Sequence, residues 1–127
     1  MSEDIVNPKR YTETELECWD FWLEAGLNPL IASAVKYVWR YKHKNGLDDL
    51  KKADVFIDKA FDSADEVYYS EKLYRPSDDE LKPMSDYQIN FIIGACMTNL
   101  ASTYKLGLAC MSDMLNEMMK EYESNND

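Results

Sequence analysis

The sequence has few of the residues that form disulfides, zinc sites or catalytic triads. Its three cysteines, Cys18, Cys96 and Cys110, are an odd number without paired spacing, and His43 is its single histidine. This composition argues against a disulfide framework, zinc sites built on several histidines and a Ser-His-Asp triad. We therefore expect the cysteines to fill core positions as small apolar residues.

Phosphate-binding glycine loops and membrane-spanning segments are also absent from the sequence. Neither Gly-x-x-x-x-Gly-Lys-Ser/Thr nor Gly-x-Gly-x-x-Gly occurs, so a P-loop kinase is excluded. There is no basic segment followed by a short apolar one, and no apolar run reaches the roughly 18 residues of a spanning helix. Together with the unpaired cysteines, these absences predict a reduced, cytoplasmic protein with no membrane partner.

Glycine, proline and strand-like alternation are scarce, which favours long helices. The 127 residues include four glycines and four prolines, and no segment alternates polar and apolar residues for long enough to form a strand. The content of 46% hydrophobic and 13% aromatic residues is sufficient for one core. We predict an all-α, compact domain of about four to five helices.

Positive charge is scarce in the chain as a whole. It has 14 basic and 24 acidic residues and a net charge of −10. Stable non-specific binding to nucleic acid needs many cations to replace the counterions of the phosphate backbone, so we do not expect it. The simplest role of the acidity is solubility, and the alternative is mimicry of nucleic acid toward a basic host protein.

The expected domain organisation follows polar ends and breaker residues. It consists of a flexible N-terminus at 1–9, a helical core with a basic helix–turn–helix segment at 10–72, a linker at 73–84, a C-terminal helical region at 85–122 and a flexible tail at 123–127. The linker is expected because two of the four prolines fall within it.

Capping residues set the expected ends of the first two helices. Thr12 and Glu15 form a capping box before the first helix, which Gly26 ends. Asn28 caps the second helix, with the following proline at its first position. We expect this second helix to run to the Asn-Gly pair at residues 45–46.

Two further helical segments complete the expected fold. The third helix starts at Asp48 and runs to about Lys72, and Ser85 and Gln88 form a second capping box. Apolar residues then follow steps of four and three along a heptad-like seam. The seam consists of Ile93, Met97, Leu100, Tyr104, Gly107, Met111, Met114 and Met118. It fits one long C-terminal helix or a helical hairpin whose two helices meet near residues 102–107, and it is a candidate seam for a homo-oligomer.

Cations gather in one short segment of this acidic chain. Between Lys36 and Lys52 lie six basic and two acidic residues, a local net charge of +4. Lys36, Arg40 and Lys44 follow helical spacing, and His43 lies beside that line. A cationic island of this kind indicates an anionic ligand.

The start of the following helix can complete an anion site. Asp49, Lys51 and Lys52 lie near that start, where free backbone N–H groups favour anions. A phosphate held between Arg40 and the helix start could accept two hydrogen bonds from the guanidinium. The candidate stacking faces for a nucleobase are Tyr37, Trp39 and Tyr41.

The alternative interpretation of the same residues is structural. In it, the aromatic side chains fill the core, the helix face is solvated, and the basic side chains form salt bridges. The candidate pairs join Arg40 or Lys44 to Asp48 or Asp49.

A stripe of carboxylates follows the basic segment. Asp54, Asp58 and Asp62 recur every four residues, and Glu17 and Asp20 form a Glu-x-x-Asp pair in the first helix. Acids on neighbouring helices can hold Mg²⁺, as in all-α nucleotide pyrophosphohydrolases. The three aspartates are therefore candidate metal ligands, although such stripes are common on solvated helix faces.

Three short stretches of the chain resemble a known family. They are residues 34–40 (Ala-Val-Lys-Tyr-Val-Trp-Arg), 44–46 (Lys-Asn-Gly) and 49–53 (Asp-Leu-Lys-Lys-Ala). They are similar to the signature of the SaV-like family of small bacteriophage proteins, a domain also found in a podophage nucleotide kinase. The resemblance extends over residues 11–60, but residues 32–33 are Ala-Ser where the family pattern has Gly-Asn.

The resemblance implies a phage-encoded helical protein of the host cytoplasm. Phosphorylation of nucleoside monophosphates is the activity linked to the family. The positions that it singles out here are Lys36, Arg40, Lys44, Asp49, Lys51 and Lys52. Because residues 32–33 depart from the pattern, the resemblance favours binding over catalysis.

Three functions follow as hypotheses. The first is binding of a nucleotide or nucleoside phosphate, with or without phosphoryl transfer; Asp49 is then the candidate catalytic residue and orients a cation or the ribose. The second is a non-enzymatic phage effector that inhibits a host protein or sequesters a signalling nucleotide, through its acidic surface or its Met-rich last helix. The third is a Mg²⁺-dependent nucleotide pyrophosphohydrolase that uses the acid stripe.

Overall fold

The computed structural model describes Thr14 and residues 16–125. This part of the chain forms six α-helices and two short 3₁₀ helices and contains no strand, so the all-α prediction is confirmed. The α-helices are α3 (Cys18–Ala25), α4 (Pro29–Arg40), α5 (Leu47–Asp62), α6 (Asp78–Leu81), α7 (Asp86–Met97) and α8 (Tyr104–Asn125). The one-turn helix α6 lies in the segment expected to be a plain linker.

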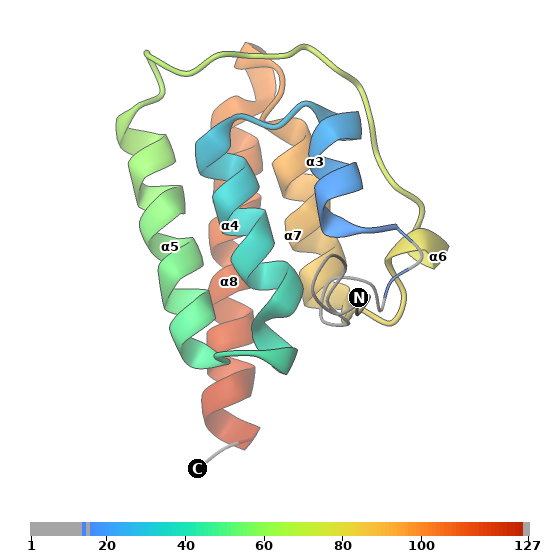
Figure 1. The fold of residues 1–127 in the computed structure, drawn as a ribbon. Coiled ribbons are helices and arrows are strands. Elements are labelled where there is room, and N and C mark those ends of the chain that lie inside the picture. The colour runs from blue at the N-terminus through green and yellow to red at the C-terminus, as the bar shows by residue number, and fades with distance from the viewer. Residues whose placement is uncertain (1–13, 15, 126–127) are drawn as a thin grey trace, which may run out of the picture.

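Two antiparallel helical hairpins make up the body of the protein. α4 and α5 form the first hairpin, and α7 and α8 form the second, with α8 as the longest helix (Figure 1). α3 lies beside α4 and α7, and the chain between α5 and α6 crosses one end of the bundle (Figure 1). Fully buried side chains from both hairpins form the shared core: Ile31, Leu50, Ile57, Phe91, Ile92, Leu108, Met111, Leu115 and Met118.

The junction of α3 and α4 follows the expected capping pattern. Gly26 ends α3 with φ +67°, a left-handed conformation that glycine adopts without strain. The Asn28 side chain accepts a hydrogen bond from the Ile31 N–H at 3.0 Å, with Pro29 at the first helical position. The start of α3 differs from the prediction, because α3 begins at Cys18. The predicted capping residues Thr12 and Glu15 lie outside the described residues.

The turn between α4 and α5 starts earlier than the sequence predicted. α4 ends at Arg40, and residues 41–43 form a 3₁₀ helix instead of continuing it. The predicted line of cations along one helix therefore ends at Arg40, and Lys44 lies in the turn. Gly46 precedes α5 with φ +53°, and a Cβ there would clash with the hydroxyl end of the Tyr122 side chain of α8. Any other residue at position 46 would strain this backbone conformation and require the Tyr122 ring to move.

α5 ends ten residues before the predicted end at Lys72. Its last residue is Asp62, and residues 63–77 form a connector without an α-helix. Asn99, a buried residue after α7, holds this connector. Its side-chain amide donates to the Ala25 carbonyl at 2.6 Å and to the Lys72 carbonyl at 3.4 Å. The backbone carbonyl of Asn99 accepts a hydrogen bond from the Glu71 N–H at 3.0 Å. The spacing of residues in the sequence does not reveal these long-range hydrogen bonds. The helix predicted from the apolar pattern was therefore too long.

The C-terminal region is a hairpin, one of its two predicted forms. The capping box of Ser85 and Gln88 starts α7 as expected. The chain leaves the helix between Met97 and Tyr104, so the heptad-like seam is interrupted there. Its later members are buried inside the protein's own core, as Met111 and Met118 are. These seam residues thus pack inside a single chain, and a homo-oligomer stays a prediction.

Hydrogen bonds between the two hairpins fix their relative position. The Gln88 side chain donates to the Val38 carbonyl at 3.1 Å, which joins α7 to α4. The Tyr104 hydroxyl donates to the Ala60 carbonyl at 2.9 Å, which joins α8 to α5. Both bonds are buried, where an unmade hydrogen bond costs roughly 1–3 kcal/mol. Among the helices of the described residues, none combines the length and apolarity needed to cross a membrane.

Candidate functional site

A buried ion pair underlies the basic segment. Arg40 at the end of α4 donates from Nη2 to Oδ1 of Asp49 in the first turn of α5, at 3.3 Å. Asp49 is 0% exposed and Arg40 is also buried. The Asp49 carboxylate further accepts from the Asn45 backbone N–H at 3.2 Å and from the Asn45 side-chain amide at 3.5 Å. Asp49 therefore fastens the turn and fixes the direction of the Arg40 side chain.

This pair corrects the predicted phosphate position. A phosphate was expected between Arg40 and the start of the following helix, but the carboxylate of Asp49 occupies that position. The alternative interpretation had included a salt bridge between these two residues, and the structure contains it. The oxygens of Asp49 are buried and already accept hydrogen bonds, so the structure gives this residue a positioning role.

Three cationic side chains from α4 and α5 lie close to the Tyr37 ring. The Arg40 guanidinium carbon lies 4.8 Å from the ring centroid, and the Nζ atoms of Lys36 and Lys52 lie at 5.6 and 5.5 Å. Phe56 of α5 stacks on Tyr37 with centroids 5.9 Å apart and an interplanar angle of 17°. Cations at such distances are attracted by the ring quadrupole. We call Lys36, Tyr37, Arg40 and Lys52 the Tyr37 cluster.

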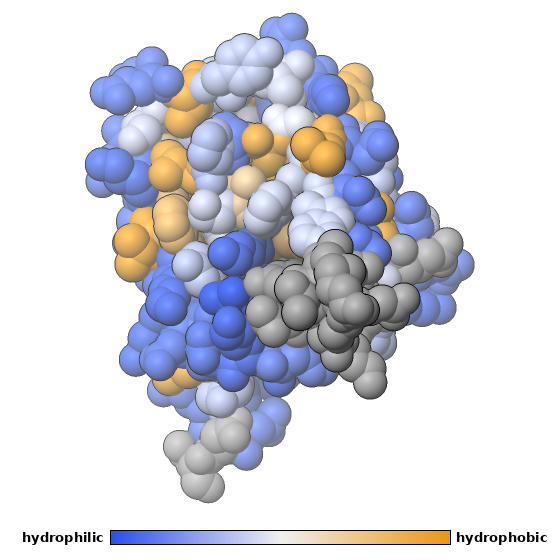
Figure 2. All heavy atoms as spheres, in the orientation of Figure 1, coloured by the Kyte–Doolittle hydropathy of each residue, from blue (hydrophilic) through white to orange (hydrophobic). Residues whose placement is uncertain are grey.

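The Tyr37 cluster carries excess positive charge. One cation of the cluster, Arg40, pairs with the carboxylate of Asp49. Within the described part of the chain, neither Lys36 nor Lys52 forms an ion pair. Two positive charges thus have no ion-pair partner in the part of the chain that the structure describes, although the net charge of the protein is −10. Figure 2 shows hydrophilic residues concentrated toward the lower end of α4 and α5 in that view.

A pocket between α3 and α4 adjoins the Tyr37 cluster. It has a volume of about 220 Å³ and is lined by Cys18, Trp19, Trp22 and Lys36. Trp19 is 39% exposed at its edge, and the indole N–H of Trp22 is buried without a hydrogen-bond acceptor among the described residues. We call this the tryptophan pocket. Lys36 belongs both to its wall and to the Tyr37 cluster.

The electrostatics of Cys18 support this proximity. Burial raises the pKa of the Cys18 thiol, and the positive charges of Lys36 and Arg40 partly oppose that rise. Both cations are therefore close enough to act on a wall of the tryptophan pocket. Because its pKa stays above the usual value, the thiol is protonated at neutral pH and is a poor nucleophile. Cys18 is part of the core, as expected, while Cys96 and Cys110 are only partly buried.

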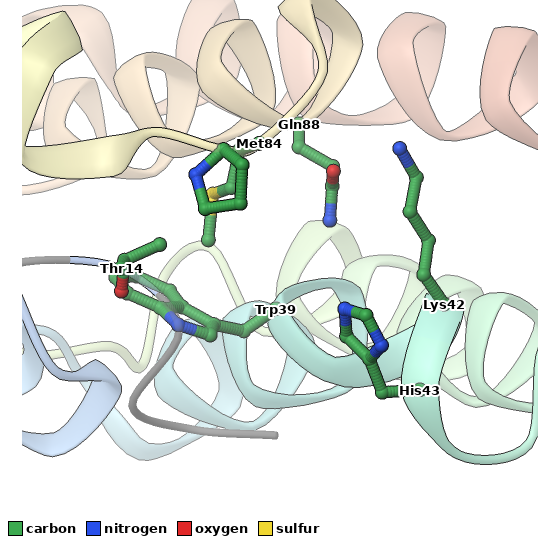
Figure 3. Close-up of a pocket in the computed structure, with 7 residues that line it drawn as sticks. Thr14, Trp39, Lys42, His43, Met84 and Gln88 are labelled. Atoms are coloured by element: carbon green, nitrogen blue, oxygen red, sulfur yellow. The ribbon is translucent and has the colours of Figure 1, made fainter. Parts of the chain in front are cut away.

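Trp39 does not offer the stacking face predicted for it. It is 4% exposed and packs against Phe21, with ring centroids 5.8 Å apart. Trp39 and His43 both line a small cavity between the end of α4 and the start of α7 (Figure 3). The full lining is Thr14, Trp39, Lys42, His43, Pro83, Met84 and Gln88. A volume of about 30 Å³ accommodates water but not a nucleobase. Tyr41 is likewise buried, so neither ring is open to a base.

The remaining predicted residues lie apart from these features. Lys44 and Lys51 are exposed, Lys44 in the turn and Lys51 in the first turns of α5. Asp58 and Asp62 are exposed on α5, and Asp54 is half-buried there. Within residues 14 and 16–125, no group of three or more acidic, histidine or cysteine side chains is arranged to hold a metal ion.

Reasoning from the sequence missed the tryptophan pocket and the stacking of Phe56. In the sequence, the spacing of three between Trp19 and Trp22 is typical of the buried face of a helix, and it therefore indicates a core role rather than a pocket. The residue type could have indicated a pocket, because two tryptophans one helical turn apart present indole edges and N–H groups that need hydrogen-bond acceptors. The position of Lys36 against them could be found only from the fold.

These features define an all-α domain with an aromatic pocket beside a cationic cluster. Residues 5–58 match the model of a protein family of unknown function, DUF3310. This segment contains every residue of the Tyr37 cluster and of the tryptophan pocket, together with Asp49 and Phe56. No curated protein and no solved structure matches the chain.

Proposed function

We propose that the protein binds the phosphate of a nucleotide or nucleoside phosphate at the Tyr37 cluster. The observation that carries this proposal is the convergence of Lys36, Arg40 and Lys52 within 4.8–5.6 Å of one ring centroid. Three like charges held this close repel one another, and the ring face compensates only part of that repulsion. An anion that enters between them removes the repulsion and gains charge-assisted hydrogen bonds.

The cluster is prepared for binding before any ligand arrives. Arg40 is held by Asp49, so its guanidinium loses little conformational freedom on binding. Lys36 and Lys52 come from different helices and approach the ring from α4 and α5. An anion of two charges, such as a phosphate monoester, matches the two cations that form no ion pair with a described residue.

We place binding ahead of catalysis in this proposal. Asp49, the candidate catalytic residue, is buried and engaged with Arg40 and Asn45. The resemblance to SaV-like phage proteins supports a nucleotide as the phosphate carrier and a phage origin for the chain. Phosphoryl transfer would further need a bound Mg²⁺ and a second nucleotide, so it is the narrower form of the proposal.

Calorimetric titration with the eight common ribo- and deoxyribonucleoside 5′-monophosphates, with and without Mg²⁺, tests the proposal. We expect Lys52→Ala to weaken the strongest interaction roughly tenfold, which is the value of a hydrogen bond to a charged group. Lys51→Ala is the matched control, since Lys51 is the exposed neighbour on the same helix. Equal affinities for wild type and Lys52→Ala, or no heat from any nucleotide, would contradict the proposal.

A second candidate function, inhibition of a host protein, is favoured by an apolar groove on another face. The groove has a volume of about 380 Å³ and is lined by residues that include Leu73, Ile93, Met97 and Leu100. Leu73 is 86% exposed, an unusual state for leucine that marks interaction surfaces when apolar neighbours adjoin it. If this function holds, Leu73→Asp abolishes binding to a purified partner, whereas Leu106→Asp at the exposed position on α8 does not.

A further inference from the structure

We infer that the tryptophan pocket holds the base of the bound nucleotide, while the phosphate lies at the Tyr37 cluster. This inference rests on the proposed function and adds a second contact surface to it. Cys18, Trp19, Trp22 and Lys36 form the base site, and Lys36 is the residue that joins it to the phosphate site. The ligand class is therefore a mononucleotide that lies across the outer face of α4.

The size of the pocket sets what enters it. Its volume of about 220 Å³ is below the ~300–1,000 Å³ of sites that enclose a whole drug-sized ligand. It accepts one flat ring system and leaves a sugar and its phosphate outside. A free phosphate alone leaves the apolar walls unused.

The chemistry of the walls favours an aromatic ring with hydrogen-bond acceptors. The two indoles supply faces and edges against which a base can stack, and Cys18 adds a small apolar wall. The Trp22 N–H has no acceptor among the described residues, although it is buried. Because this N–H is closed to solvent, the Trp22 indole must shift before a ring nitrogen or carbonyl of a base can accept a hydrogen bond from it, an acceptor that a purely apolar ring lacks.

The other aromatic residues of the segment are less suited to the base. Tyr37 is occupied by Phe56 and by three cations, and Trp39 is 4% exposed. Lys36, in contrast, lines the tryptophan pocket, and its Nζ lies 5.6 Å from the Tyr37 centroid. A ligand whose phosphate reaches Lys36 thus has its next group directed along α4 toward the two indoles.

The test compares base and phosphate contributions with variants of exposed residues. Trp19→Ala should weaken the tightest-binding nucleoside monophosphate roughly tenfold or more, because base–aromatic stacking is lost. Trp19→Phe should restore most of the affinity, since it keeps a stacking ring. Leu23→Ala, at an exposed position of the same helix, should leave the affinity unchanged. Far-ultraviolet circular dichroism and thermal unfolding establish that each variant is folded.

The outcomes separate this inference from the proposed function. If Trp19→Ala binds the nucleotide as wild type does while Lys52→Ala weakens it, the base site is refuted and the phosphate site stands. If Trp19→Ala weakens binding and Lys52→Ala does not, the base site stands and the phosphate site is refuted. If Trp19→Phe is as weak as Trp19→Ala, stacking is not the contribution of Trp19 and the base site is refuted. Absence of binding by all eight monophosphates refutes both.

Discussion

The two helix pairs on either side of the bundle are packed in opposite ways. Between α7 and α8, a Cβ added to Gly107 would lie 2.6 Å from the carbonyl oxygen of Gly94, so no side chain fits. Between α3 and α4, the chain leaves a pocket of about 220 Å³ beside two tryptophans. The α7–α8 pair is therefore packed as closely as its backbones allow, and the α3–α4 pair, which we call the open side, leaves a pocket.

The difference shows where stability and binding reside in this chain. Close approach of α7 and α8 gives many dispersion contacts between their buried side chains. The α3–α4 pair keeps an unfilled pocket, and α4 and α5 keep a buried ion pair and cations that form no ion pair with a described residue. Natural proteins commonly accept such local costs at the places where they bind ligands.

The largest expected effect comes from the ion pair between α4 and α5. Asp49→Ala leaves Arg40 buried without its carboxylate and should lower the free energy of unfolding by about 3–5 kcal/mol. Urea denaturation followed by circular dichroism measures this loss. The double variant Arg40→Leu with Asp49→Leu should recover most of it, because no charge is then buried alone. Asp48→Asn, at the exposed neighbouring residue, should change stability by less than about 0.5 kcal/mol.

The next effect lies on the closed side. Gly107→Ala should destabilise the protein by about 1–3 kcal/mol, because the new methyl group meets the backbone of α7. Alanine gains up to ~1 kcal/mol of helix propensity over glycine, so a net loss shows that the clash dominates. Leu106→Ala, at the exposed adjacent position, is the control for denaturation experiments. A stabilised Gly107→Ala would mean that α7 and α8 are not in close contact.

A larger side chain in the pocket on the open side should increase the free energy of unfolding, the opposite of the effect of Gly107→Ala. Cys18→Met extends an unbranched side chain from the wall of the tryptophan pocket and should raise stability by up to about 1 kcal/mol. The same variant should weaken nucleotide binding, since the pocket is occupied. Cys18→Ala is the matched control and should lower stability while leaving the pocket open. If Cys18→Met and Gly107→Ala lower the free energy of unfolding by similar amounts, the two helix pairs do not differ in packing as described.

The smallest expected effect concerns Asp54 on α5. Burial raises its pKa above the ordinary 3.8, and the charge of Asp58 raises it further. A raised pKa means that ionisation is less favourable in the folded state, so this group lowers stability as pH rises above about 4. Asp54→Asn should therefore raise the melting temperature slightly at pH 7 and leave it nearly unchanged at pH 3. Thermal unfolding at the two pH values checks the sign.

Much of the fold could be predicted from local residue chemistry. The helix class, the glycine end of α3, the Asn28 cap and the Ser85 capping box depend on residues within one turn of one another. The predicted ends at residues 45–46 and at Lys72 were wrong. There, contacts between distant residues decide the structure, such as the bonds of Asn99 to Ala25 and Lys72.

The candidate site was located only in part by sequence reasoning. The cationic segment was visible in the composition, and the alternative of an Arg40 salt bridge was considered. The convergence of Lys36 and Lys52 on Tyr37 depends on how α4 and α5 pack, which spacing within one helix does not determine. For the same reason, the base-stacking role moved from Trp39, whose ring is buried, to Trp19 and Trp22 in the proposal above.

The connector at residues 63–77 has a consequence for how the polypeptide can be divided. It contains no α-helix, joins the two hairpins and leaves Tyr68 exposed to a protease such as chymotrypsin. A single cut after Tyr68 puts α3, α4 and α5 on one fragment and α6, α7 and α8 on the other. Since the bonds of Gln88 and Tyr104 and the shared core cross between them, we expect the fragments to remain associated. The protein is thus a natural candidate for a two-piece complementation reporter.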